Sequence, residues 1–190
     1  MRKATIIGLC GKATVGKDTV ADYLVREHGF EKAAFAAPLK DVAAQLFGWP
    51  RAALDDAEAK QRVDAFWGLS PRTALQRLGT DCIREQFGAD FWIKTLERRY
   101  LQRGEADSSP LRLVVADVRF PNEADAIKRW GGALWRLEGP SRGRDGALLS
   151  GDNAAHASET ALDHFAGWDS VLENVGTLEM LHAEIEARLE

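Results

Sequence analysis

The chain is poor in cysteine and has no apolar run long enough to cross a membrane. Its two cysteines, Cys10 and Cys82, lie far apart and lack metal-ligand spacing, so we expect free thiols in a reducing compartment. A net charge of −4 does not imply a broad basic face for duplex DNA. The first apolar run, residues 4–9, is too short for a signal peptide. These deficits predict a cytoplasmic protein with no membrane or nucleic acid polymer as partner.

What the chain does contain is a glycine-bounded loop between an apolar run and a helical pattern. The loop and the start of the helix read Gly11, Lys12, Ala13, Thr14, Val15, Gly16, Lys17, Asp18 and Thr19. In such a loop the backbone N–H groups turn around an anion, and the helix N-terminus adds its positive dipole end. Lys17 can then reach the β and γ oxygens of a nucleoside triphosphate. The pattern predicts a nucleotide-dependent phosphotransferase or NTPase with these residues at the nucleotide and Lys17 in catalysis.

One position departs from the usual pattern, because Asp18 stands where a serine or threonine normally ligates Mg²⁺. The hydroxyl comes one place later, at Thr19. Asp18 could ligate Mg²⁺ directly or through water, since hard cations take oxygen ligands. Alternatively, Asp18 caps the helix and Thr19 serves the metal. Both residues are therefore candidate metal ligands.

Short apolar runs alternate with helical patterns along the chain. We expect strands at residues 4–9, 32–35, 111–116, 133–137 and 170–172. We expect helices at 17–28, from Pro38, from Pro71, at 90–103, at 121–130 and from Thr177. This alternation predicts an α/β fold with a parallel sheet covered on both sides. The segment 139–151 is rich in Gly, Ser and Arg, which is typical of a mobile lid.

Two of these helices have apolar stripes that predict which face is buried. Val42, Leu46 and Phe47 mark the face of the helix that Pro38 opens. In the helix that Pro71 opens, the stripe consists of Leu75, Leu78, Cys82, Ile83 and Phe87.

A polar stripe lies opposite that second apolar face. Arg72 and Gln76 are one turn apart and point the same way, with Asp81 beside their row. Arg72 could bind a substrate phosphate through two hydrogen bonds, and the Gln76 amide could form hydrogen bonds with the edge of a nucleotide base. An ordinary solvated helix face is the alternative. Trp92 could border a base pocket, or simply belong to the core as most tryptophans do.

Charged residues also follow the most apolar strand. Asp117 and Arg119 stand at its carboxyl end, where open α/β sheets bind ligands. Asp117 could hold Mg²⁺ through water or accept a proton, and Arg119 could neutralise the transferring phosphate; alternatively, the two only anchor the next helix. Arg136, Arg142 and Arg144 flank or lie in the Gly-rich segment, where a closing lid could bring one of them onto the phosphates.

Taken together, the motifs resemble those of phage-type deoxynucleoside monophosphate kinases over nearly the whole chain. The residues that carry the resemblance are Gly11 to Thr19, Phe35 to Lys40, Leu75 to Asp81, Phe91 with Trp92, Asp117 with Arg119, Glu123, Gly131 with Gly132, His156 to Glu159 and Asn174 to Leu178. The order and spacing of these motifs are specific, although each later motif is weak alone. The Gly-Lys-Asp-Thr variant of the loop is itself a trait of that family.

The resemblance implies transfer of the ATP γ-phosphoryl group to a deoxynucleoside 5′-monophosphate, with Mg²⁺. It implies a three-layer P-loop kinase fold with a central parallel sheet, often dimeric: one domain over 1–190 with a helical substrate-binding insert at about 48–103 and a lid at about 139–151. By the resemblance, Lys17, Asp18 and Thr19 would belong to the ATP–Mg²⁺ site. From the residues themselves we expect Arg136 at the nucleotide, and Arg142 or Arg144 of the lid in catalysis. The monophosphate side would consist of Lys40, Arg72, Gln76 and Asp81, with Asp117 and Arg119 between the two sides.

Three other classes share parts of this pattern. Phosphomevalonate kinases of one type have the same Gly-Lys-Asp loop but need a cationic pocket and no base slot. A P-loop kinase acting on a hydroxymethylated base within DNA would need a basic groove, which the charge of −4 disfavours. A protein whose bound nucleotide only switches a binding surface would have no acceptor pocket.

Overall fold

The computed structural model describes residues 4–102, 110–140 and 160–189. The chain divides into two compact units. The first unit comprises residues 1–34 and 103–190, and the second comprises residues 35–102. None of the helices in the described ranges is both long and apolar enough to span a membrane.

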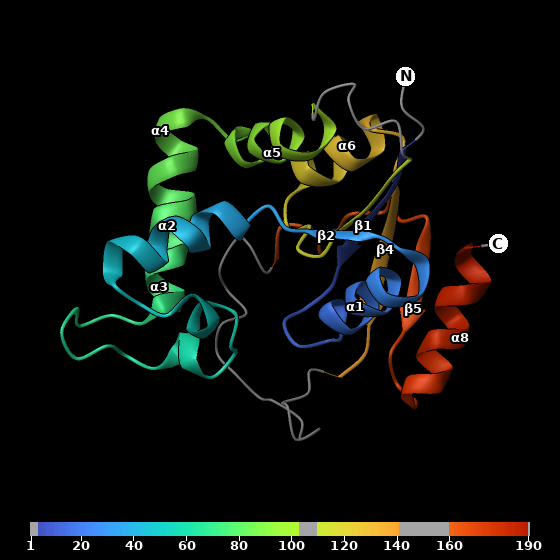
Figure 1. Ribbon diagram of the computed structural model, residues 1–190, viewed down its shortest axis with the longest axis horizontal. Coiled ribbons are helices and arrows are strands. Elements are labelled where there is room, and N and C mark those ends of the chain that lie inside the picture. The colour runs from blue at the N-terminus through green and yellow to red at the C-terminus, as the bar shows by residue number, and fades with distance from the viewer. Residues whose placement is uncertain (1–3, 103–109, 141–159, 190) are drawn as a thin grey trace. The chain divides into compact units, whose positions relative to one another are not determined.

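A five-stranded parallel sheet forms the centre of the first unit (Figure 1). Its strands are β1 (Ala4–Cys10), β2 (Glu31–Ala33), β3 (Leu111–Val115), β4 (Ala133–Glu138) and β5 (Ser170–Glu173). The strand order is β2-β3-β1-β4-β5, so β1 is central and pairs with both β3 and β4. The expected α/β fold with a parallel sheet is confirmed, and β2 ends two residues earlier than predicted.

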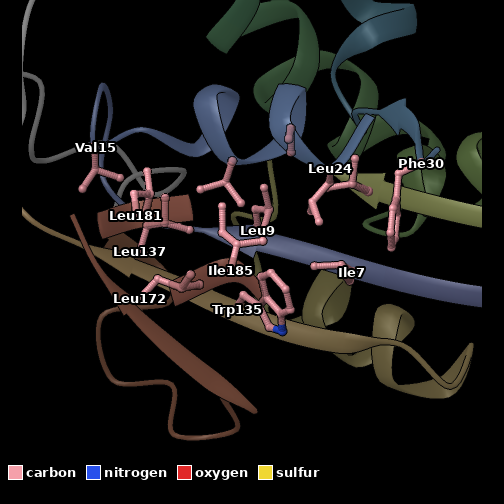
Figure 2. Packing of buried hydrophobic residues seen from close by; sticks show 14 residues of the cluster. Ile7, Leu9, Val15, Leu24, Phe30, Trp135, Leu137, Leu172, Leu181 and Ile185 are labelled. Carbon is pink, nitrogen blue, oxygen red and sulfur yellow. The ribbon is translucent and has the colours of Figure 1, made fainter. Parts of the chain in front are cut away.

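Helices cover both faces of this sheet. Alternate residues of β1, Ile7 and Leu9, face a cluster built with α1 (Lys17–His28) and α8 (Leu178–Leu189), which Figure 2 shows from close by. On the other face, a Cβ on Gly8 would lie 3.0 Å from Ile127 of α6 (Pro121–Arg129). A strand buried on both faces reads as a continuous apolar run, which explains why β1 was recognisable from the sequence.

The second unit is helical and has a smaller core of its own. Its elements are α2 (Ala37–Phe47), short 3₁₀ turns at Arg51–Leu54 and Ala59–Gln61, α3 (Pro71–Gln76), α4 (Glu85–Phe87) and α5 (Phe91–Leu96). Wide π-helical turns at Arg77–Arg84 and Glu97–Leu101 continue α3 and α5. The core cluster contains Ala43, Trp49, Leu54 and Ala74.

The predicted buried faces of α2 and of the Pro71 helix are partly wrong. On α2, the buried side chains are Leu39 and Ala43, whereas Val42 and Leu46 are 44% and 60% exposed. After α3, Cys82 is exposed and Phe87 is 71% exposed. The π-helical turns explain the second error, because a wider turn shifts every later residue out of the 3.6-residue period on which the stripe was based.

A polar contact joins α1 to α8 on the surface of the first unit. Glu186 accepts a hydrogen bond from the Tyr23 hydroxyl at 2.6 Å and lies 2.8 Å from the His28 ring. The Tyr23 hydrogen bond, and then the one from His28, hold the pKa of Glu186 below its usual range. A carboxylate with a lowered pKa in the folded state stabilises the fold above its unfolded-state pKa, and this contribution is lost as the pH falls through the folded-state value.

We therefore expect Glu186→Gln to lower the melting temperature at pH 7 by about 1–3 °C, as for an exposed pair. The difference from the wild-type protein should shrink as the pH falls through the acid range in which Glu186 is protonated. Melting curves from pH 7 to pH 3 measure this difference. Glu85→Gln, which removes an exposed carboxylate from α4, is the charge control, and an equal effect of both variants at pH 7 would contradict the role of Glu186.

Candidate active site

The glycine-bounded loop connects β1 to α1 in a conformation that the sequence favours. Gly11 and Gly16 adopt φ values of 148° and 105°, which side chains rarely tolerate, and Thr14 has φ of 60°. The Val15 side chain is 1% exposed and packs in the core cluster beside Leu137 and Leu181 (Figure 2). The Val15 side chain therefore anchors the loop in the core. Because that side chain is buried, only the backbone atoms of Val15 could contact a ligand.

The Lys17 side chain folds back over the loop. Its Nζ donates hydrogen bonds to the carbonyl oxygens of Gly11 and Lys12, both at 2.7 Å. The ammonium group is thus held across the loop that would surround an anion. The N-terminus of α1, with twelve residues behind it, adds its positive dipole end at the same place.

The loop lies where the connections from two neighbouring strands, β1 and β3, run to opposite faces of the parallel sheet. α1 follows β1 and covers one face, whereas α6 follows β3 and packs on the other face. In open α/β sheets, ligands bind at the carboxyl ends of two such neighbouring strands. Asp117 and Arg119 follow β3, so the structure brings them to the same edge as Gly11 and Lys17.

A pocket of about 220 Å³ opens beside the loop at this edge. Its walls include Cys10, Lys12, Arg119, Arg136, Leu162 and Asp163. Burial raises the pKa of the Cys10 thiol, and the nearby charges of Lys17, Arg136 and Arg119 act in the opposite direction. Cys10 is therefore a neutral thiol at pH 7 in surroundings rich in positive charge.

Two of the cations in the pocket are held by acidic neighbours. Arg136 Nε lies 2.8 Å from Glu138, and its guanidinium lies 5.7 Å from the centre of the Trp168 ring. Lys12 forms an ion pair with Asp163, and this hydrogen bond lowers the pKa of Asp163. Each of these two cations is thus paired with a carboxylate that also lines the pocket.

Asp18 lies at the first turn of α1, where it forms an ion pair. Lys32 Nζ is 2.9 Å from Asp18 and 2.8 Å from Asp22. Burial acts to lower the pKa of Lys32, but the hydrogen bonds that its ammonium donates to the carboxylates of Asp22 and Asp18 outweigh burial, and the pKa is raised. Lys32 therefore stays charged and partly neutralises a carboxylate that would otherwise repel a polyphosphate.

The start of α6 is anchored by Glu123. Its buried carboxylate accepts hydrogen bonds from the backbone N–H groups of Arg119 at 2.8 Å and Phe120 at 3.2 Å. This contact fixes the backbone at Arg119. Glu123 therefore anchors the start of α6 directly after Arg119.

The expected monophosphate residues belong to the second unit. Arg72 and Gln76 lie on α3, and the Arg72 Nε is buried without a hydrogen-bond partner among the described residues. Lys40 is 2.7 Å from Asp55, and Asp81 is exposed in the π-helical turns.

Trp92 is buried in this unit, and its indole N–H donates to the Gly79 carbonyl oxygen at 3.1 Å. Its position favours a structural role over the predicted one at a base pocket. Arg142 and Arg144, the proposed lid arginines, fall within 141–159, outside the described residues.

Several residues near the loop were not predicted as site residues. Asp163, Leu162 and Glu138 line the pocket, and Asn174 contacts the loop itself. All four are distant from the loop in the sequence, and none has a local pattern that marks it. Asn174 was noticed only as part of a resembling motif, without a role.

The loop, its lysine and its place in the sheet define a P-loop nucleotide-binding protein. Solved kinase structures share the fold. A shikimate kinase from Aquifex aeolicus aligns with a TM-score of 0.53 at 14% identity, over 97% of this chain and 95% of that one. A gluconokinase from Sinorhizobium meliloti aligns with a TM-score of 0.50 at 15% identity, over 100% and 95%.

Sequence comparisons identify the family. Residues 53–185, more than half of the chain, match the family described as deoxynucleotide monophosphate kinase. A protein of Acanthamoeba polyphaga mimivirus assigned as a deoxynucleotide monophosphate kinase is 35% identical over 95% of this chain and 93% of its own length. The deoxynucleotide monophosphate kinase of Enterobacteria phage T4 is 24% identical over 97% and 98%. The chain belongs to the deoxynucleotide monophosphate kinase family, as the sequence motifs predicted.

Proposed function

We propose that the protein transfers the γ-phosphoryl group of ATP to a deoxynucleoside 5′-monophosphate, giving ADP and the deoxynucleoside diphosphate. A phosphate oxygen of the acceptor forms a bond to the γ phosphorus, and the bond from that phosphorus to the β–γ bridging oxygen breaks. The observation that carries the proposal is the Lys17 ammonium held across a phosphate-binding loop, in a chain of this family.

On the donor side, the loop would bind the triphosphate. Its backbone N–H groups would face the phosphates, and Lys17 would exchange the carbonyl oxygens of Gly11 and Lys12 for phosphate oxygens. Arg119 and Arg136 line the adjoining pocket, and their positive charges would favour binding of the negatively charged phosphate chain there. Charge spreads over the γ-phosphate oxygens during transfer, so fixed cations at this place lower the barrier.

On the acceptor side, Arg72 is the best-supported residue. A buried guanidinium nitrogen without a partner is costly, and an anionic ligand would remove that cost. Gln76 lies one turn further along α3 and could contact the same acceptor. Lys40, which pairs with Asp55, and the exposed Asp81 are the other acceptor-side candidates.

The residues at the first turn of α1 fit a magnesium ion. Asp18 and Thr19 both present exposed oxygen donors there, the kind that Mg²⁺ prefers. Among the described residues, no group of three or more acidic, His or Cys side chains could form a metal cage. Mg²⁺ held by one or two protein oxygens, water and phosphates needs no such cage. Bound there, the ion would neutralise charge on the β- and γ-phosphates.

We expect Asp18→Ala to raise the Mg²⁺ concentration for half-maximal rate on the order of tenfold, more than Thr19→Ala does. Rates measured across a Mg²⁺ titration at saturating ATP test this. Asp22→Ala is the matched control, because it removes the other carboxylate that pairs with Lys32 and leaves Asp18 in place. An unchanged metal dependence in Asp18→Ala would show that the carboxylate serves only the Lys32 ion pair.

A coupled assay of ADP release across all deoxy- and ribonucleoside monophosphates tests the proposed function. We expect activity on at least one deoxynucleoside monophosphate and none on phosphomevalonate. Activity only on phosphomevalonate, or only on DNA with hydroxymethylated bases, would replace the acceptor class and leave the nucleotide site in place. ATP binding without transfer to any acceptor would instead favour a nucleotide-controlled switch.

A further inference from the structure

Asn174 connects the end of the sheet to the phosphate-binding loop. It follows β5 directly, and its backbone N–H donates to the Glu138 carbonyl oxygen at 2.7 Å, which extends the β4–β5 pairing by one step. Its side-chain Nδ2 donates to the Val15 carbonyl oxygen at 3.0 Å. Asn174 is thus fixed by its backbone to the sheet and by its side chain to the loop.

Two glycines leave room for this side chain and its backbone. A Cβ on Gly16 would lie 2.5 Å from Asn174 Nδ2, closer than real contacts allow. A Cβ on Gly139 would lie 2.5 Å from the Asn174 carbonyl oxygen. Any residue larger than glycine at either position would displace Asn174. Gly16 is therefore required for two reasons, its φ of 105° and its contact with Asn174.

The bond to Val15 sets the direction of one peptide unit. In a planar trans peptide, the carbonyl of one residue and the N–H of the next point in opposite directions. Holding the Val15 carbonyl toward Asn174 therefore turns the Gly16 N–H away from Asn174. That N–H has no acceptor among the described residues, so it is available to a bound anion.

We propose that Asn174 is a positioning residue that orients the Val15–Gly16 peptide, so that the Gly16 N–H donates to a phosphate of the bound nucleotide. The inference rests on the proposed nucleotide site at this loop. Asn174 acts through the backbone of the loop and does not itself touch the reacting atoms. The core fixes Val15 by its side chain and Asn174 fixes it by its carbonyl, so together they determine the orientation of this peptide.

The direct test follows the Gly16 amide proton by NMR while ADP is added. In the wild-type protein, we expect this resonance to move to lower field as the N–H donates to a phosphate. In Asn174→Ala, the shift at saturation should be markedly smaller, and the ADP dissociation constant should rise about three- to tenfold, as for one lost hydrogen bond. A wild-type Gly16 shift in the folded variant would overturn the proposal.

Asn174→Asp is the second variant, because it keeps the side-chain shape but sets a carboxylate oxygen against the Val15 carbonyl oxygen. Its effect should equal or exceed that of Asn174→Ala, and it supplies the test if the alanine variant does not fold. Wild-type behaviour of Asn174→Asp would also overturn the proposal. Glu184→Ala is the matched control: it removes the hydrogen bond to the neighbouring Glu173 N–H, at 3.3 Å, without a contact to the loop.

Steady-state kinetics separate positioning from general damage. Loss of Asn174 should raise the KM for ATP and leave the KM for the acceptor unchanged, whereas a smaller folded fraction would lower kcat and leave both KM values unchanged. The second pattern, with an unaltered Gly16 shift, would count against the proposal. The ADP titration needs no acceptor, so it tests the role of Asn174 even if the protein phosphorylates no deoxynucleoside monophosphate.

Discussion

Replacing Lys17 with alanine should lower kcat by on the order of a hundredfold or more while the melting temperature stays near that of the wild-type protein. The Lys17 ammonium donates hydrogen bonds to two carbonyl oxygens of its own loop, and Lys17 is not part of the core cluster, so its loss should leave the fold in place. The same ammonium would stabilise charge on the transferring phosphoryl group, and losing such a fixed charge raises the barrier strongly. Initial rates at saturating ATP and acceptor, with melting curves on the same samples, measure both quantities.

Lys12→Ala is the matched comparison for Lys17. It removes the same charge from the same loop, but the Lys12 ammonium is paired with Asp163 at the pocket wall. We expect a smaller loss of turnover than in Lys17→Ala. Near-normal turnover in well-folded Lys17→Ala, or equal losses in both variants, would contradict the assignment of Lys17 as the catalytic lysine.

The second large effect is expected on the acceptor side. Arg72→Ala should raise the KM for the deoxynucleoside monophosphate and lower its kcat/KM by roughly ten- to a hundredfold, about 1.5–3 kcal/mol for a lost hydrogen bond to a charged group. The KM for ATP should change much less. The reason is the buried Arg72 Nε, which lacks a partner among the described residues and would gain one from the acceptor phosphate.

Arg77→Ala is the control for this prediction, since it removes an exposed arginine five residues further along the same helical segment. We expect both KM values to stay at the wild-type level in that variant. If Arg72→Ala raises the KM for ATP as much as the KM for the acceptor, Arg72 does not belong to the acceptor site.

The sheet and the loop could be predicted because local sequence determines them. From Ile6 onward β1 is buried on both faces and therefore reads as an apolar run, and Gly11 and Gly16 are required by backbone angles that other residues avoid. The position of Lys17 then follows from chain connectivity alone. Family membership followed from the order of the motifs, and the sequence comparisons confirm it.

The parts that could not be predicted depend on contacts between distant residues. Asn174 and Val15 are 159 positions apart, and no local period connects them. The Lys12–Asp163 pair spans 151 positions. In the second unit, the buried face was mispredicted at Cys82 and Phe87 because the π-helical turns change the number of residues per helical turn. No particular residue type predicts a π-helical turn from the sequence.

The central place of β1 affects how the protein can fold as it is synthesised. β1 ends at Cys10, but its two neighbours begin only at Leu111 and Ala133, after the whole second unit. At about 5–20 residues per second, the ribosome adds those neighbours roughly 5–25 s after β1 emerges. During that interval, the apolar strand that precedes the glycine-bounded loop has both edges unpaired, so the nascent chain is exposed to aggregation and to chaperone binding.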